Sequence, residues 1–152
     1  MNKIALASDH AGYQLKEVLK AHLEESGYVV SDFGTDSEEP VDYPDFIRPA
    51  AKSVVDGRNS LGIVLGGSGN GEAMVANKVR GVRCALCWNV KSARLAREHN
   101  DANMISIGAR LVSEQTAMKI VDAWLKASFE GGRHNRRLGK MERGRQSLDC
   151  EK

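Results

Sequence analysis

The sequence has few aromatic residues, cysteines and prolines, and it contains no long apolar run. Aromatic side chains make up 5% of the 152 residues, and there are 3 cysteines and 3 prolines. A small, odd number of cysteines argues against a disulfide-stapled extracellular fold. No apolar stretch approaches the roughly 20 residues of a membrane-spanning helix. Asp9 and His10 come too early for the apolar region of a signal peptide. We therefore expect a cytoplasmic protein with no membrane partner.

A strong excess of one charge is also missing, because the formal net charge is only +2. The basic residues are nevertheless concentrated near the C-terminus. Residues 133–145 contain one acid, Glu142, and the basic residues Arg133, Arg136, Arg137, Lys140, Arg143 and Arg145. This segment has no aromatic residue that could stack on bases, which weakens the case for nucleic-acid binding. We expect no nucleic-acid partner; a solvated terminal helix and a small phosphate site stay open.

Two of the cysteines, Cys84 and Cys87, have the C-x-x-C spacing of redox and zinc sites. The residues around them, 82–86, indicate a short strand, in which side chains three positions apart point to opposite faces. Thiols on opposite faces cannot share a metal ion or a disulfide. We therefore interpret both cysteines as structural.

Short β-branched runs alternate with amphipathic helical stretches along the whole chain. The apolar patterns predict strands at residues 3–7, from 28, 61–65, 83–87 and 104–107, and helices at 13–26, 46–55, from about 72, 90–99 and from 113. This alternation is typical of an α/β protein, a doubly wound three-layer αβα sandwich around a five-stranded parallel, Rossmann-like sheet. We expect a single domain over residues 1–152, with a basic helical tail from about residue 133.

In such sheets, ligands bind beyond the carboxyl ends of the strands. The first predicted strand ends at Ser8, Asp9 and His10, the third at a glycine-rich loop, and the fifth at residues 108–110. His99 and Asn100 close the helix that leads into the fifth strand. We expect these polar residues to gather at one edge of the sheet.

The glycine-rich loop reads GGSGNGE at residues 66–72 and follows the apolar run LGIVL. Four glycines after a buried strand indicate a backbone that wraps closely around an anion. A phosphate-binding loop of the G-x-x-x-x-G-K-[ST] type would need lysine where Glu72 stands. An anion cradle with a carboxylate beside it suggests a base that works next to a developing negative charge. The ordinary alternative is a first-turn glutamate favoured by the helix dipole.

Six short motifs together resemble the type B ribose-5-phosphate isomerases, a family that includes galactose-6-phosphate isomerase subunits and allose-6-phosphate isomerases. The motifs are SDHAG at 8–12, DYP at 42–44, GGSGNGE at 66–72, ANKVRG at 76–81, AREHNDAN at 96–103 and GGRHNRR at 131–137. The resemblance runs from about residue 3 to residue 140. It implies a sugar-phosphate isomerase that interconverts ribose 5-phosphate and ribulose 5-phosphate through a cis-enediolate, without a metal or cofactor.

The resemblance also implies a role for each site residue. Many members carry a catalytic cysteine at the position of Gly66, whereas a second branch with this loop uses the glutamate at position 72. By resemblance, the catalytic residues are Glu72 as base, His99 and Asp9 for ring opening, and Ser68 in the anion hole. The same resemblance assigns substrate binding to Asp9, His10, Gly67, Ser68, Gly69, Asn70, Gly71, Asn100, Arg110, Arg133 and Arg137.

The family works as a homodimer or a larger assembly, such as a tetramer, with sites shared between chains. The resemblance therefore implies that the half of a site with Asp9, His10 and the glycine-rich loop faces His99, Asn100 and Arg110 of a partner chain. Two rival functions stay open at this point. One is the isomerisation of a six-carbon sugar phosphate, and the other is a non-catalytic phosphosugar-binding module, which would not need Glu72 and His99 together.

Overall fold

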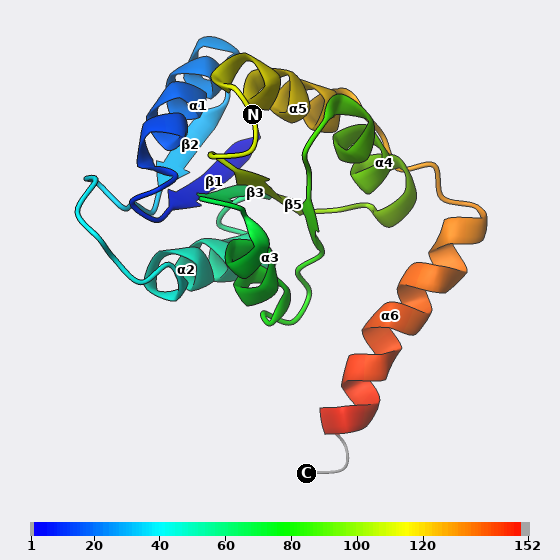
Figure 1. The fold of residues 1–152 in the computed structure, drawn as a ribbon. Helices are drawn as coiled ribbons and strands as arrows, with labels where there is room; N and C mark the ends of the chain where they lie inside the picture. Colours follow the sequence, from blue (N-terminus) through cyan, green and yellow to red (C-terminus); the bar gives the residue numbers. More distant parts are fainter. Residues whose placement is uncertain (1, 150–152) are drawn as a thin grey trace.

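The structure of the chain is a computed structural model that describes residues 2–149. Strands and helices alternate through most of it (Figure 1). The elements are β1 (Lys3–Ser8), α1 (Tyr13–Glu25), β2 (Val29–Asp32), α2 (Pro44–Val55), β3 (Leu61–Gly66), α3 (Asn70–Asn77), β4 (Cys84–Leu86), α4 (Val90–Asn100), β5 (Met104–Gly108), α5 (Glu114–Lys126) and α6 (Arg133–Asp149).

The five strands form one sheet in the order β2-β1-β3-β5-β4, and every neighbouring pair is parallel. The register pairs Ser8 with Leu65 and Gly66 with Gly108, so β1, β3 and β5 end at the same level. From β1 the chain continues to β2, on one side of the sheet. From β3 it continues to β4 and β5, on the other side. This reversal places the loops after β1 and β3 at a topological switch point, the usual ligand position in such folds.

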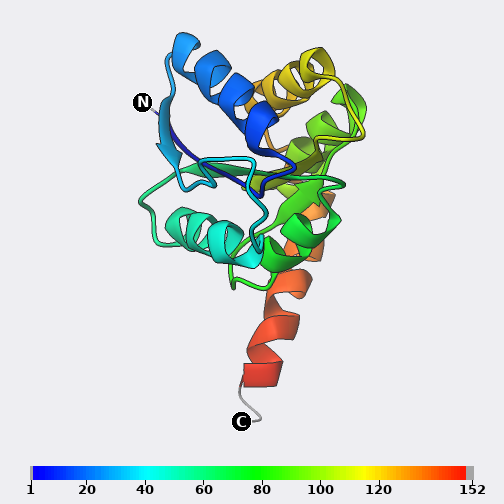
Figure 2. The same cartoon turned by 60° about the vertical axis from the view of Figure 1, so that its left-hand side comes forward.

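Helices cover both faces of the sheet, which confirms the predicted three-layer arrangement. Helices α1, α4 and α5 lie on one face, and α2 and α3 lie on the other (Figures 1 and 2). Side chains alternate accordingly: Ile4 and Leu6 pack with the first group, and Ala5 and Ala7 with the second. Because both faces are covered, β3 and β5 are buried along their whole length and β1 is buried after Lys3, so these strands can meet a ligand only at their ends.

The two cysteines near β4 lie on opposite faces of the sheet, as the strand pattern predicts. Cys87 is buried in the cluster beneath α1, α4 and α5, whereas Cys84 packs against the cluster on the α2 side. Both are free thiols. Burial raises the pKa of Cys87 to about 12 and raises the pKa of Cys84 further. Neither thiol is therefore suited to nucleophilic or acid–base chemistry near neutral pH.

Several predicted element ends shift by one or two residues in the structure. The strand predicted for 83–87 is shorter, because β4 covers only Cys84–Leu86. The helix predicted from about residue 72 begins earlier, at Asn70, since Gly69 adopts a left-handed φ of 81° and turns the chain directly into α3. Glu72 therefore lies in the first turn of the helix. Ser113 caps α5 by accepting a hydrogen bond from the Thr116 backbone N–H, so the helix itself begins at Glu114.

Helix α6 leaves the body of the molecule and extends away from it (Figures 1 and 2). It follows Gly131 and Gly132, whose φ angles of +67° and +57° are both in the left-handed region. Two consecutive residues of this conformation redirect the chain, and glycine adopts it without steric cost. The basic tail predicted from about residue 133 is thus a helix that starts at Arg133. Within residues 2–149, no helix has the length and apolar character needed to cross a membrane.

Candidate active site

The side chain of Glu72 is buried near the carboxyl end of β3. The residue is only 4% exposed, although it sits on the first turn of α3 beside an open loop. A β-carbon added to Gly66 would lie 2.0 Å from Glu72 Oε1 and 2.1 Å from its Cδ. The carboxylate thus fills the space that a side chain at position 66 would occupy. A glutamate turned inward at position 72 therefore requires glycine at position 66.

The surroundings of Glu72 change its acidity. Loss of hydration on burial raises the pKa of the carboxyl group, and repulsion from Asp9 adds to the increase. A hydrogen bond from the residue's own backbone N–H acts in the opposite direction. Burial outweighs it, so the net shift is upward. A carboxylate with a raised pKa is a stronger base than an ordinary surface glutamate.

The glycine-rich loop is held against β5 and the residues after it. The Ser106 hydroxyl donates to the Gly69 carbonyl over 2.7 Å, and the Ala109 backbone N–H donates to the Gly66 carbonyl over 2.8 Å. Gly108 allows the closest approach, because an added β-carbon there would lie 2.5 Å from the Ser68 carbonyl oxygen. These contacts fix the loop backbone before any ligand arrives, which is the condition for a preorganised anion site.

Asp9 and His10 follow β1, next to the loop. Asp9 is 8% exposed, and its Oδ1 accepts a hydrogen bond from the Gly12 backbone N–H over 3.0 Å. His10 Nδ1 accepts from the Val41 backbone N–H over 3.1 Å. Because Nδ1 acts as the acceptor, the imidazole proton is on Nε2 and can be donated to an anion.

Two further groups line this half of the site. The ring of Tyr43 covers Gly71, since a β-carbon on Gly71 would lie 2.6 Å from Tyr43 Cζ. Ser68 and Asn70 are exposed on the loop, and the Ser68 hydroxyl accepts from the Asn70 backbone N–H over 3.3 Å. The loop therefore presents the polar side chains of Ser68 and Asn70 toward solvent.

The structure corrects the position expected for His99 and Asn100, which do not lie at the same edge as Glu72. Helix α4 runs antiparallel to the strands, so it ends where β5 begins, four residues before Met104. Glu72 instead follows the carboxyl end of β3. The five residues of β5, about 16 Å of extended chain, separate the two edges. The prediction failed because it placed the last residues of the helix at the carboxyl end of the following strand. A helix that precedes a parallel strand ends near the point where that strand begins.

Arg110 also departs from the expected grouping with His99 and Asn100. Its backbone N–H donates to the Gly67 carbonyl over 3.0 Å. Its guanidinium Nη1 lies 3.1 Å from the position of an added β-carbon on Gly67. Arg110 therefore belongs to the same half of the site as the glycine-rich loop of its own chain. We refer to Asp9, His10, residues 66–72 and Arg110 as the loop half.

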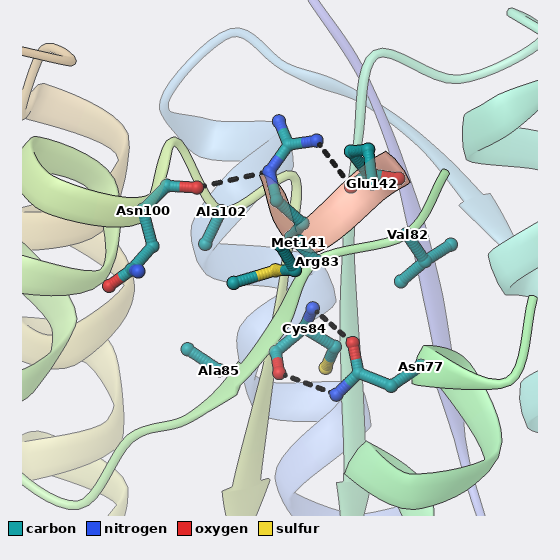
Figure 3. A pocket seen from close by; sticks show the side chains of 9 residues that line it. All are labelled: Asn77, Val82, Arg83, Cys84, Ala85, Asn100, Ala102, Met141 and Glu142. Atoms are coloured by element: carbon teal, nitrogen blue, oxygen red, sulfur yellow. Dashed lines mark hydrogen bonds and ion pairs between the residues drawn. The ribbon is translucent and has the colours of Figure 1, made fainter. Parts of the chain in front are cut away.

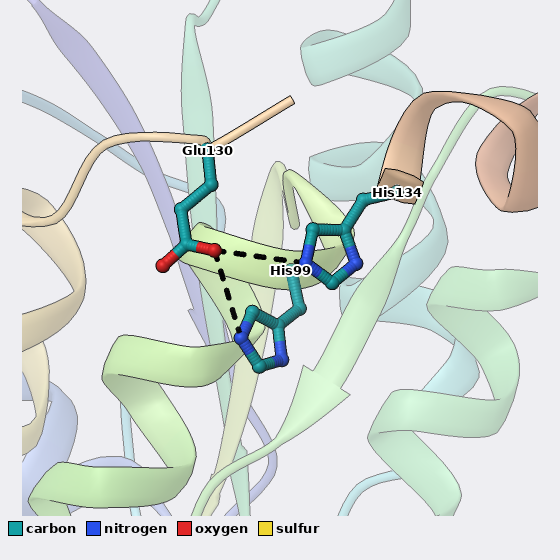
Figure 4. A group of neighbouring side chains, drawn as sticks. All are labelled: His99, Glu130 and His134. Atoms are coloured by element: carbon teal, nitrogen blue, oxygen red, sulfur yellow. Dashed lines mark ion pairs between the residues drawn. The ribbon is translucent and has the colours of Figure 1, made fainter. Parts of the chain in front are cut away.

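The second group of predicted residues lies at the opposite edge of the sheet, and we refer to His99, Asn100, Arg133 and Arg137 as the helix half. His99 stacks on His134, with ring centroids 4.5 Å apart and an angle of 19° between the ring planes. Glu130 turns its carboxylate toward both rings (Figure 4). His99, Glu130 and His134 are also a group of side chains close enough to hold a metal ion.

Arg83 anchors Asn100 in the helix half. Its guanidinium donates to the Asn100 carbonyl over 3.0 Å and to the Asp101 carbonyl over 2.9 Å. The same group pairs with Glu142 of α6 at 3.4 Å (Figure 3). A pocket of about 280 Å³ lies beside this contact and is lined mainly by Val82, Cys84, Ala85, Ala102 and Met141. With apolar walls and its arginine already paired, this pocket is poorly suited to a sugar phosphate.

Arg133 and Arg137 are exposed near the start of α6. Their four-residue spacing places them on one side of the helix, as the sequence predicts. Sequence reasoning did not find Glu130 and Arg83 or the dependence of Glu72 on Gly66. Glu130 lies four residues before His134, but such a pair carries no specific signal by itself.

Comparison with known proteins gives a consistent set of relatives. Residues 4–141 match the family model described as Ribose/Galactose Isomerase. A ribose-5-phosphate isomerase B from Mycolicibacterium paratuberculosis is 50% identical over 138 residues, which cover 90% of this chain and 87% of the relative. The solved ribose-5-phosphate isomerase B of Clostridium thermocellum is 48% identical, with a TM-score of 0.95 over 96% of this chain and 99% of that one.

A third relative was solved with a sugar phosphate. It is ribose-5-phosphate isomerase B from Mycoplasma genitalium with bound ribulose-5-phosphate, 42% identical to this chain, with a TM-score of 0.90. The similarity covers 95% of this chain and 96% of that structure. These relatives share the fold over nearly their whole lengths.

Proposed function

Because this chain belongs to the ribose/galactose isomerase family, we propose that it interconverts ribose 5-phosphate and ribulose 5-phosphate, as in the pentose phosphate pathway. The observation that carries the mechanism is the position of Glu72. A buried carboxylate with a raised pKa lies beside a loop of preorganised N–H groups, in the space that position 66 leaves open. This arrangement suits removal of a proton from carbon next to a carbonyl group.

In the proposed reaction, Glu72 moves a proton between C2 and C1 of the open-chain sugar. Removal of the proton creates negative charge on the oxygens of a cis-enediolate. The backbone N–H groups of residues 67–71 and the Ser68 hydroxyl stabilise that charge. Donors that are already held in place stabilise a transition state without reorganising at the moment of reaction.

Sugar phosphates reach the enzyme largely as rings, so a ring-opening step comes first. We assign His99 as the acid that protonates the ring oxygen, because a ring nitrogen of histidine can donate a proton. Asp9 accepts the proton of the anomeric hydroxyl in this scheme. Its buried position close to Glu72 supports this role.

The phosphate group is held by four cationic or polar groups in our proposal. His10 donates through Nε2, and Arg110 lies beside the glycine-rich loop. Arg133 and Arg137 complete the clamp from α6, where their shared side of the helix suits one phosphate. Asn100 holds sugar hydroxyls.

We further propose that a complete site combines the loop half of one chain with the helix half of another, in a homodimer or a tetramer. Two features support this. The two halves lie at opposite edges of the sheet in one chain. Large apolar side chains stand exposed near both halves, with Trp88 61%, Leu111 67% and Met141 51% exposed. A partner chain would bury such surface.

A cytoplasmic location follows from the same proposal. The two cysteines within the described part of the chain are free thiols, which fits a reducing compartment.

The proposed function is tested by turnover assays with ribose 5-phosphate, allose 6-phosphate and galactose 6-phosphate, each in the presence of EDTA. We expect ribose 5-phosphate to give the highest kcat/KM and EDTA to leave the rate unchanged. A preference for a six-carbon substrate would indicate that the chain has another activity of the same family. Binding without turnover of any of the three would favour a phosphosugar-binding module.

A further inference from the structure

Three metal-ligating side chains converge in the helix half. The ligand atoms of His99, Glu130 and His134 all lie within 4.8 Å of one another. Glu130 Oε2 is 3.9 Å from His99 Nε2 and 3.6 Å from His134 Nε2 (Figure 4). Two imidazoles and one carboxylate form a common zinc donor set, with a fourth position left open. Tetrahedral bonds of about 2.0–2.2 Å need ligand atoms roughly 3.3–3.5 Å apart, so small side-chain rotations would close this triangle.

One of these ligand atoms lacks a partner. His134 is 5% exposed, and its Nε2 is buried without a hydrogen bond. The distance of 3.6 Å to Glu130 Oε2 is too long for a hydrogen bond. A buried polar atom in this state costs free energy, and native structures seldom leave one unsatisfied. A metal ion between the three side chains would supply the missing partner.

The backbone holds these side chains together before any ion binds. The Glu130 backbone N–H donates to the Glu98 carbonyl over 3.0 Å, which fixes Glu130 beside the end of α4. The left-handed pair Gly131 and Gly132 then turns the chain back, so that His134 stacks on His99. Three ligands from two segments that are far apart in the sequence thus converge.

The surroundings select the kind of ion. The charges of Arg133 and Arg137 oppose any cation. Hard ions such as Mg²⁺ prefer oxygen ligands and would gain little here. Zn²⁺ and Co²⁺ form strong bonds to imidazole nitrogen and suit this site better.

We propose that His99, Glu130 and His134 bind Zn²⁺ or a similar divalent transition-metal ion reversibly, and that the bound ion inhibits the enzyme. Binding of the ion follows from the cluster itself. Inhibition rests on the proposed function. An ion bound to His99 Nε2 occupies the lone pair of this nitrogen, which then cannot carry the proton that ring opening needs. The bound ion regulates the isomerase and takes no part in its chemistry.

Metal binding is tested first without any activity measurement. Chelator-stripped protein is titrated with Co²⁺, whose visible absorption strengthens in a tetrahedral site. We expect one ion per chain and no thiolate charge-transfer band, because the cluster contains no cysteine. Glu130→Gln and His134→Gln should each weaken binding at least ~10-fold. The control is His22→Gln, which removes a histidine that pairs with Asp122 far from this cluster and should leave binding unchanged.

Inhibition is tested with Zn²⁺ in the turnover assay. We expect Zn²⁺ to inhibit the wild-type enzyme, EDTA to restore the rate, and Mg²⁺ at the same concentration to have no effect. Glu130→Gln should keep its rate in EDTA within a few-fold of the wild type and need at least ~10-fold more Zn²⁺ for half inhibition. Equal Zn²⁺ sensitivity of the wild type and Glu130→Gln, or Co²⁺ binding that ignores Glu130 and His134, would overturn the proposal.

The two proposals can fail separately. If Co²⁺ binds as expected but ribose 5-phosphate is not isomerised, the metal site stands and the proposed function falls. If the protein isomerises ribose 5-phosphate but Co²⁺ does not bind, the function stands and the metal site falls.

Discussion

The loop half and the helix half are built on different physical principles. The loop half grows from the ends of buried parallel strands, and its key carboxylate, on Glu72, is 4% exposed. The helix half stands at the end of α4 and on the projecting helix α6, where Asn100, Arg133 and Arg137 are exposed. Burial gives the loop half its altered acidity and rigidity. The helix half contributes mainly charged and hydrogen-bonding side chains.

This difference suggests a division of labour. A base that takes a proton from carbon gains from a raised pKa, which burial supplies in the loop half. Phosphate binding gains from arginines that can reach a ligand from solvent, which the helix half supplies. One chain keeps the halves apart, so the proposed reaction needs two chains. The predictions below test this division, from the largest expected effect to the smallest.

Replacement of the base should have the largest effect. Glu72→Gln keeps the size of the side chain but removes its ability to accept a proton. Since a positioned general base contributes ~10²–10⁴-fold, we expect kcat to fall at least a hundredfold with little change in KM. Exchange of the substrate C2 hydrogen with deuterated solvent should slow in parallel.

The matched control for this variant uses the cysteines. Thiol-blocking reagents should leave the wild-type enzyme largely active, because Cys87 is buried with a pKa of about 12. Two results together would refute the assignment of Glu72 as the base. Glu72→Gln would keep a turnover rate within a few-fold of the wild type, and thiol blocking would abolish activity.

Subunit mixing tests whether the two halves meet between chains. Glu72→Gln lacks a working loop half, and His99→Ala lacks a working helix half. A hybrid dimer would contain one site with both functional groups and one with neither. Random exchange should restore about a quarter of the wild-type activity, because half of the dimers are hybrids with one good site each. Absence of recovery after verified exchange would show that each site is built within one chain.

A methyl group at position 66 should displace the base. Gly66→Ala puts a β-carbon 2.0 Å from Glu72 Oε1, so the flexible carboxylate has to move away. We expect kcat to fall about 10–100-fold, a misplaced-group effect, while the fold is kept. The control is Gly139→Ala on α6, where an added β-carbon would meet only the tip of Arg143 at 3.5 Å. Full activity in Gly66→Ala would mean that Glu72 does not need this space.

Loss of one arginine should weaken binding more than chemistry. Arg137→Ala removes a charge-assisted contact that ground state and transition state share. We expect KM and the inhibition constant for inorganic phosphate to rise about 10-fold, with kcat nearly unchanged. Arg143→Ala, further along α6, serves as the matched control. Wild-type values in Arg137→Ala would place Arg137 outside the phosphate site.

The smallest expected effect concerns stability and pH. The pKa of Glu72 is raised in the folded chain, so its contribution to stability is fully present below the unfolded-state pKa of a glutamate. That contribution is lost as the pH rises through the folded-state value. Glu72→Gln should therefore melt up to a few degrees higher than the wild type at pH 8, since 1 kcal/mol corresponds to roughly 2–4 °C here. The difference should vanish below about pH 4. An equal difference at both pH values would contradict a raised pKa.

Much of the fold was predictable because its signals are local. The alternation of strands and helices, the opposite orientation of Cys84 and Cys87, and the cap at Ser113 all follow from backbone periodicity and short-range hydrogen bonding. Element ends were less predictable. Gly69 starts α3 early because its left-handed conformation ends the turn, and the spacing of apolar residues contains no information about φ.

The candidate site was predictable only in part. The motif resemblance pointed to Glu72 and His99 as candidates, whose roles stay predictions. The predicted edge of the sheet for His99 was wrong, and so was the grouping of Arg110. The direction of α4 decides the edge on which His99 lies. The contact between the loops after β3 and β5 decides the position of Arg110. Both depend on how segments far apart in the sequence pack together.

The sequence by itself determined the α/β class, the parallel sheet, the position of the glycine-rich loop after a buried strand, and the absence of cysteine at position 66. These features depend on residue type and spacing, which the chain states directly. Only the tertiary structure decided that the Glu72 carboxylate fills the space beside Gly66, that the two halves stand at opposite edges of the sheet, and that Glu130 and His134 surround His99. The reason is physical: burial, pKa shifts and ligand geometry arise from distances between segments, and a sequence of residues does not contain those distances.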